Sequence, residues 1–237
     1  MHKLSWKIRN TLFAFGNILL KLPNRIYDFV SHFGRPLHPI YRQVFPNWFW
    51  TFWFLEAFLR LLEIFGLAEL YETLATWLKV NTRPLNAKEK TLLLNIFGPH
   101  FPYQRIGIDE RAYIGPMQMN VCYVSFLTIN SWKKMSDCLL VHEMVHTWQY
   151  QRLGIVYIPR ALAVQCIVGG YNYGGIEKLQ EIFGRNGKLD EFNLEQQADI
   201  VADYCRIKSG LGPSWGKGTW VDLPVYQYFV DQLLVEN

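Results

Sequence analysis

The sequence predicts a helix-rich α+β protein, in which a small antiparallel sheet precedes a metal-binding helix and a helical extension forms the N-terminal part. Three observations predict it: a helical pattern at residues 138–150, period-two patterns between residues 102 and 132, and an apolar, aromatic stretch at residues 45–65. The chain has 237 residues, of which 50% are hydrophobic and 16% aromatic. This composition supplies a core and excludes a disordered, low-complexity protein.

The most informative motif lies on a predicted helix that begins after Ser136 and ends before Gly154. Serine is a favoured N-cap and glycine a favoured stop, so local signals define both ends. His142 and His146 lie one turn apart, about 40° around the helix axis. Both rings can therefore reach one zinc ion, with Glu143 beside any water that the ion binds. The alternative is two ordinary helix histidines next to a solvated glutamate.

A second predicted helix offers a third ligand. Asn193 can cap it, and Gln196 three residues later completes a capping box. Glu195 and Asp199 lie one turn apart on the same face, which places two carboxylates together. A catalytic zinc site needs one more protein ligand besides the two histidines, and Glu195 can supply it. The alternative is a solvated acidic face that Asp203 continues.

These two motifs resemble a known pattern. HEMVH, from His142 to His146, followed by EQQAD, from Glu195 to Asp199, is similar to the HExxH…ExxAD pattern of gluzincin-type zinc metallopeptidases. More narrowly, residues 83–209 resemble the peptidase domain of Vgr-related proteins and of proteins associated with extracellular contractile injection systems. The matching pieces are RPL with Glu89, IFG, LVHEMVHTWQYQ, GGYNYGG and FNLEQQADIVADY.

The resemblance implies a zincin-like metallopeptidase domain over residues 81–237, acting on a protein or peptide substrate. It implies that His142, His146 and Glu195 bind Zn²⁺, and that Asp199 accepts the far N–H of a ligating histidine and so fixes its tautomer. It also implies an effector or component associated with a contractile injection system. Residues 1–80 lie outside the resemblance and form the basic, aromatic-rich helical extension.

The expected chemistry follows from this ligand set. Zinc lowers the pKa of its water to about 7, and Glu143 acts as the general base and later protonates the leaving amine. We expect Tyr173, within GGYNYGG, to stabilise the developing oxyanion. Tyr171 and Tyr204 are alternatives, and Tyr173 can instead be a packed loop aromatic. Two other functions stay open, namely a non-catalytic binding or assembly module on a zincin scaffold and a membrane-associated housekeeping zinc protease.

Short strands are expected ahead of the metal-binding helix, at residues 105–108, 112–114 and 121–129. In a zincin-like fold, the edge strand of such a sheet holds extended substrate by main-chain pairing. We predict that residues 124–128 form this edge. The alternative is an internal strand with no contact to substrate.

The basic residues concentrate near the N-terminus. Residues 1–44 contain seven Lys or Arg and one Asp, a net charge of +6, so the remainder of this +4 chain carries −2. A basic amphipathic leader predicts an anionic partner, such as a phospholipid surface or an acidic protein. Nucleic acid is not expected as a partner.

The aromatic stretch at residues 45–65 reads as a helix that Pro46 opens and Gly66 ends. Its charged residues, Glu56, Arg60 and Glu63, form one narrow stripe on which Glu56 and Arg60 can pair. The charge-free run from Val44 to Leu55 has twelve residues, which is too short to cross a bilayer. Three coverings of the apolar remainder stay open: the rest of this chain, an interfacial membrane position, or a protein partner.

The four cysteines, Cys122, Cys138, Cys166 and Cys205, lie far apart and form no CxxC motif. We therefore expect no zinc ribbon and interpret Cys138 as core packing. The usage fits a reducing compartment, and no convincing signal peptide is present. The expected location is the cytoplasm or a peripheral membrane position, with export by an injection apparatus needing no signal peptide.

Overall fold

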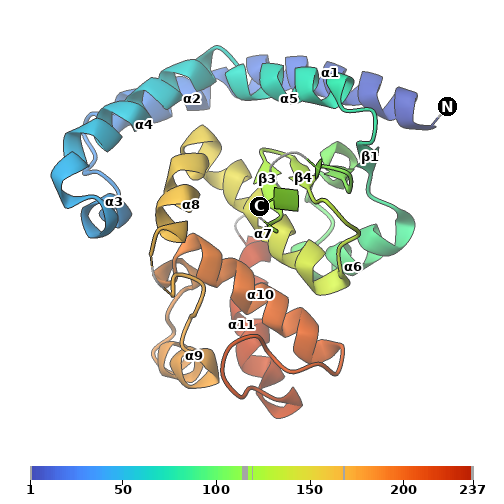
Figure 1. Ribbon diagram of the computed structural model, residues 1–237. Helices are drawn as coiled ribbons and strands as arrows, with labels where there is room; N and C mark the ends of the chain where they lie inside the picture. Colours follow the sequence, from blue (N-terminus) through green and yellow to red (C-terminus); the bar gives the residue numbers. More distant parts are fainter. Residues whose placement is uncertain (1, 114–116, 119, 168, 236–237) are drawn as a thin grey trace.

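The computed structural model describes residues 2–113, 117–118, 120–167 and 169–235. It consists mostly of helices with one small four-stranded sheet, so the expected helix-rich α+β class is confirmed. Helices of the N-terminal part lie along one side of the molecule, and the remaining helices and the sheet lie beneath them (Figure 1).

Two long helices form the centre of the lower part: α7 (Asp137–Leu153) and α10 (Leu194–Lys208), which pack along each other. Around them lie α6 (Ala87–Phe97), α8 (Tyr157–Gln165), α9 (Gly175–Gly184) and α11 (Leu223–Val235). Met144 and Trp148 of α7 share one core with Phe229 of α11, and each is almost completely buried. Burial of side chains of this size stabilises the fold by roughly 1.5–3 kcal/mol each.

The ends of both central helices are those that local signals predict. The Ser136 hydroxyl accepts a hydrogen bond from the Leu139 N–H, and α7 ends at Gly154 in a positive-φ conformation. Asn193 and Gln196 form the expected capping box at the start of α10. Cys138 is buried in the core, where its sulfur lies 3.0 Å from that of Cys205.

The sheet is mixed, so the expectation of an antiparallel sheet is wrong in one pairing. Its strands are β1 (Arg83–Pro84), β2 (Gly107–Asp109), β3 (Tyr123–Ser125) and β4 (Thr128–Asn130). They lie in the order β1-β2-β4-β3, with β2 and β4 parallel and the other two pairs antiparallel. Strand β3 runs opposite to β2, and the turn after it brings β4 back between them, parallel to β2, which alternation within a strand cannot reveal.

The predicted strand limits also need correction. Residues 124–128 do not form one strand, because Phe126 takes a positive φ of 57° and turns the chain between β3 and β4. Strand β3 lies at one edge of the sheet and β1 at the other, while β4 is internal. Residues 103–105 form a 3₁₀ turn, so β2 begins only at Gly107. Ala112 and Tyr113 lie in no strand, and Ile114 lies outside the described residues.

Residues 2–78 contain helices and no strand in the described structure. These helices are α1 (His2–Leu20), α2 (Leu22–His32), α3 (Pro39–Val44), α4 (Phe49–Ile64) and α5 (Leu67–Leu78), with a 3₁₀ turn at Pro46–Trp48. Helix α1 packs beside α5, and α2 beside α4. We call these four helices the N-terminal layer (Figure 1). The division into residues 1–80 and 81–237 stays a prediction.

The charged stripe of α4 faces the rest of the protein. The Glu56 carboxylate accepts hydrogen bonds from both Nε and Nη2 of Arg160 at 2.8 Å, and from the Tyr41 hydroxyl at 3.0 Å. The prediction that Glu56 pairs with Arg60 is therefore wrong, because Glu56 pairs with Arg160 of α8. No helix among the described residues has the length and apolar composition that crossing a bilayer requires.

Candidate metal centre

The structure brings together His142, His146 and Glu195, the three residues expected to bind a metal. The Nε2 atoms of the two histidines lie 3.2 Å apart. Oε2 of Glu195 lies 3.4 Å from Nε2 of His142 and 3.2 Å from Nε2 of His146. Ligand atoms at the corners of a tetrahedron around zinc are about 3.3–3.4 Å apart, for bonds of about 2.0–2.1 Å. These three residues can therefore hold a metal ion.

The second ring nitrogen of each histidine, Nδ1, lies within hydrogen-bond distance of an oxygen acceptor. Nδ1 of His142 lies 2.8 Å from Oδ1 of Asp199, and Nδ1 of His146 lies 2.9 Å from the amide oxygen of Gln149. The Gln149 amide has a defined orientation, because its nitrogen donates to the Leu194 carbonyl and to Gln197, both at 2.9 Å. Each Nδ1 therefore carries a hydrogen, and each neutral ring directs the Nε2 lone pair towards Glu195.

Glu195 is held on its other side as well. Its Oε1 accepts a hydrogen bond from the Gln165 amide at 2.9 Å, and the side chain is 1% exposed. Two imidazole lone pairs and a carboxylate oxygen thus converge with no donor between them when both rings are neutral. Such an arrangement is repulsive unless a cation or a proton occupies the centre. The donor set of two nitrogens and one oxygen suits zinc.

The carboxylates shift the pKa values of the two histidines. Burial opposes the charged form of His142, but hydrogen bonds to Asp199 and Glu195 outweigh it and raise its pKa to about 10. Burial likewise opposes the charge on His146, and Glu195 raises its pKa overall. A proton and a metal ion therefore compete for the same nitrogens.

Glu143 is buried next to this group. The side chain is 4% exposed, and its Oε2 has no hydrogen-bond partner among the described residues. Burial raises its pKa, which the charges of His142 and His146 partly counter. A buried carboxyl oxygen without a partner is costly in a purely structural role. Its position suits a group that exchanges a proton beside a metal.

Tyr173 is not at the metal centre, which corrects the expectation that it stabilises an oxyanion. Its hydroxyl donates to Asp203 at 2.7 Å and lies 3.0 Å from the Tyr226 hydroxyl, in the core between α10 and α11. Asp203 lies two turns beyond Glu195 on α10 and bonds to the backbone of Ser214 and Trp215. Asp203 therefore belongs to this core cluster and does not continue a solvated face.

A different tyrosine of the same loop approaches the histidines. The Tyr171 ring lies parallel to that of His142, with centroids 6.5 Å apart and an interplanar angle of 19°. The ring centroid of Tyr157 lies 6.0 Å from that of His146. Burial and the carboxylates of Glu195 and Glu143 raise the pKa of both phenols. Tyr171 is 37% exposed, and the side chain of His142, at 12%, is more exposed than those of His146 and Glu195.

Sequence reasoning missed the three side chains that orient the ligands besides Asp199. Gln149 had a usable signal, because it follows His146 by three residues and so shares its helix face. Gln165 on α8 and Trp215, whose indole N–H donates to Asp199 at 2.6 Å, had none. Tyr204 faces α11, where its hydroxyl bonds to Gln227.

Comparison of this chain with known protein families, with curated proteins and with solved structures finds no match. The chemical interpretation of the site therefore depends on its own geometry.

Proposed function

We propose that this chain is a zinc-dependent metallopeptidase of zincin-like fold that hydrolyses peptide bonds. One observation carries the proposal: three acceptor atoms converge at tetrahedral spacing beside a buried carboxyl group that has an unpaired oxygen. The HExxH…ExxAD pattern of the sequence also supports it, because it contains these four residues and Asp199. An association with contractile injection systems rests on the sequence resemblance alone.

His142, His146 and Glu195 would hold the zinc ion, and each ligand is oriented by a second side chain. Asp199 and Gln149 keep both histidines in the Nδ1–H tautomer, and Gln165 directs Oε2 of Glu195 inward. When bound, zinc would lower the pKa of a coordinated water to about 7 and polarise the scissile carbonyl. Because the three ligands occupy three corners, one position is available for water or substrate.

Glu143 acts as the proton carrier. Its carboxylate takes a proton from the attacking water, and the protonated form then gives that proton to the leaving amine, so the carboxylate is regenerated. The direction of its pKa shift suits this double role, because burial raises the pKa and so makes the protonated form easier to reach. Tyr171 is the phenol on the solvent-accessible side, and its hydroxyl can donate to the developing oxyanion.

The substrate backbone can pair with the exposed edge of β3. Strand β3 packs against α7. Cys122, the residue before β3, lies near Glu143: burial raises the pKa of the Cys122 thiol most, and the Glu143 carboxylate raises it further. An extended peptide added to this edge would therefore run past Glu143.

Two measurements test the proposal. Purified protein should bind one zinc ion, and His146→Ala should lose it, whereas the exposed His100→Ala should keep it. Cleavage profiling on a denatured proteome should show products with the wild type and none with Glu143→Gln at equal zinc content. Exposed Glu181→Gln is the matched carboxylate control.

The outcomes separate the competing functions. Zinc retained by His146→Ala would refute the ligand assignment. Zinc bound by the wild type with identical cleavage profiles for wild type and Glu143→Gln would instead identify a non-catalytic module.

A further inference from the structure

Helices of the N-terminal layer direct polar side chains towards the protein and apolar side chains towards the outside. On α4 the acidic residues face the protein, where Glu56 is 1% and Glu63 is 9% exposed. The opposite side of the helix carries one continuous apolar stripe with helical spacing, formed by Trp50, Phe54, Phe58, Leu61 and Phe65, all exposed. A helix in contact with water normally shows the reverse arrangement.

Helix α1 repeats this pattern. Its exposed stripe is formed by Leu4, Ile8, Leu12, Phe15 and Leu19. Its inward side carries polar groups that bond to the rest of the protein, such as Lys7, whose ammonium donates to the Lys79 carbonyl at 3.1 Å. The Trp6 indole donates to the Gln104 carbonyl at 2.8 Å from the same side.

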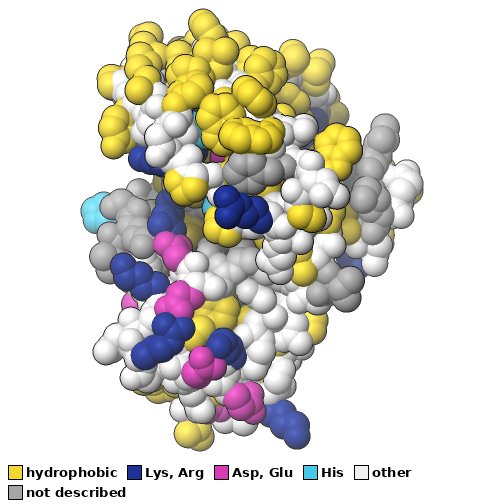
Figure 2. Space-filling view, turned by 90° about the vertical axis from the view of Figure 1, so that its left-hand side faces the viewer, with side chains coloured by type: hydrophobic (Ala, Val, Ile, Leu, Met, Phe, Trp, Pro, Cys, Tyr) yellow, Lys and Arg dark blue, Asp and Glu magenta, His cyan; other side chains and the backbone are white. Residues whose placement is uncertain are grey.

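The exposed apolar side chains concentrate on this layer. Of the 36 large hydrophobic side chains that are exposed in the described structure, 25 lie between Leu4 and Val80. Figure 2 shows hydrophobic side chains gathered over the upper end of the molecule, with Lys and Arg side chains below them. Isolated exposed apolar residues are ordinary, but a contiguous patch of this extent marks an interaction surface.

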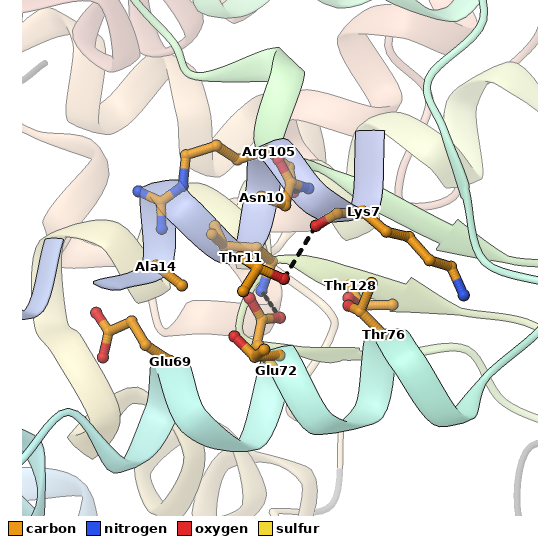
Figure 3. A pocket seen from close by; sticks show the side chains of 11 residues that line it. Lys7, Asn10, Thr11, Ala14, Glu69, Glu72, Thr76, Arg105 and Thr128 are labelled. Atoms are coloured by element: carbon orange, nitrogen blue, oxygen red, sulfur yellow. Dashed lines mark hydrogen bonds between the residues drawn. The ribbon is translucent and has the colours of Figure 1, made fainter. Parts of the chain in front are cut away.

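The polar groups beneath the layer hold it in this orientation. Figure 3 shows Asn10 and Thr11 of α1 and Glu72 of α5 directed into a small polar cavity above the sheet. Asn10 donates to the Arg105 carbonyl at 3.2 Å, and the Glu72 carboxylate accepts from the Leu127 N–H at 2.6 Å. Turning these helices to bury their apolar stripes would break such bonds, so the outward apolar face is part of the fold.

The charges of the layer are separated by sign. No carboxylate of the described residues 2–80 belongs to an exposed side chain: Asp28 and Glu72 are half-buried, and Glu56, Glu63 and Glu69 are buried. Glu69 pairs with the buried Arg25. By contrast Lys3 and Arg9 of α1 are exposed, as are Arg35 and Arg42 in the segment between α2 and α4. The outer surface is therefore apolar with cations beside it.

We propose that the N-terminal layer docks onto the surface of an anionic phospholipid bilayer, with its helices lying in the membrane plane. The helices of the layer run along one side of the molecule, which fits an extended partner (Figure 1). Exposed Trp48, Trp50 and Trp77 are side chains that favour the membrane interface, and the exposed cations complement anionic headgroups. A second copy of this chain is disfavoured, because the exposed cations beside one apolar surface would approach those of the other copy.

This inference is independent of the proposed chemistry and is tested on the full-length chain by vesicle flotation. Wild type should float with vesicles of phosphatidylcholine and phosphatidylglycerol, and much less with phosphatidylcholine alone. The triple variant Leu12→Gln, Phe58→Gln, Leu74→Gln should lose roughly tenfold or more in binding. Lys3→Gln with Arg9→Gln should weaken binding to the anionic vesicles and reduce its salt dependence.

The matched control is the triple variant Leu162→Gln, Leu211→Gln, Val221→Gln, which changes three exposed apolar residues outside the layer. It should float as the wild type does. All substitutions are at exposed positions, and thermal unfolding by circular dichroism verifies the fold. Failure of the wild type to float, equal loss in both triple variants, or equal binding to neutral and anionic vesicles would overturn the proposal. So would a stable dimer that the first triple variant dissociates without vesicle binding.

Discussion

Gly154 and Glu63 meet where the last turn of α7 reaches the N-terminal layer. A Cβ atom on Gly154 would lie 2.5 Å from the Glu63 carboxylate, and the φ angle of Gly154 is +68°. The same carboxylate accepts a hydrogen bond from the Ile155 N–H at 3.1 Å. The C-terminal end of α7, the helix that carries His142 and His146, is therefore held by a residue of α4.

Gly154→Ala should destabilise the protein by about 1–3 kcal/mol, because alanine is strained at this φ and its methyl group displaces Glu63. Urea unfolding measures the change. Gly184→Ala is the control, since a methyl group there meets open space on helix α9 and should be neutral or slightly stabilising. Equal effects of the two substitutions would contradict the close approach.

The pairing of Glu56 with Arg160 predicts that Glu56→Gln destabilises the protein more than Arg60→Gln does. Glu56→Gln should cost about 3–5 kcal/mol of unfolding free energy, because it leaves the Arg160 charge without its partner in a mostly buried position. Replacing both residues, by Glu56→Leu with Arg160→Met, should recover part of this loss. Arg60→Gln should cost less than about 1 kcal/mol. A larger loss from Arg60→Gln than from Glu56→Gln would favour the pairing within α4.

Gln149 predicts an effect on metal affinity without being a ligand. Gln149→Leu removes the acceptor that keeps the hydrogen on Nδ1 of His146, so zinc affinity should fall by about 10–100-fold. Competition with a chelator measures the affinity. The exposed Gln180→Leu should leave it unchanged. An unaltered affinity in Gln149→Leu would show that His146 does not need this acceptor.

Glu72 predicts a pH dependence of stability away from the metal centre. Its carboxylate lies in the cavity of Figure 3, and burial raises its pKa to about 8 from an ordinary value of 4.5. Because the folded pKa exceeds the unfolded one, this group's contribution to stability is full below about pH 4.5. It is lost progressively as the pH rises to about 8.

Glu72→Gln should remove this loss while keeping an acceptor for the Leu127 N–H. The free energy of unfolding of the wild type should therefore fall relative to that of the variant between pH 5 and pH 8, as measured by urea titrations at several pH values. Parallel pH profiles of the two proteins would show that Glu72 does not titrate in this range.

The sequence alone determined the features that depend on neighbouring residues of one helix. The Ser136 cap, the Asn193–Gln196 capping box and the one-turn spacing of His142 and His146 are local, so backbone geometry suffices to predict them. For α4, the sequence predicted the narrow charged stripe, but it did not predict that this stripe faces the protein and the apolar side faces outwards.

Only the tertiary structure decided how separate segments meet. It brought Oε2 of Glu195 close to Nε2 of both histidines, placed the ring of Tyr171 and not that of Tyr173 beside His142, and gave Glu56 a partner on α8. The parallel pairing of β2 with β4 belongs to the same class. Such contacts join residues far apart in the chain, and the packing of the whole core selects them, so helical spacing and period-two alternation carry no information about them.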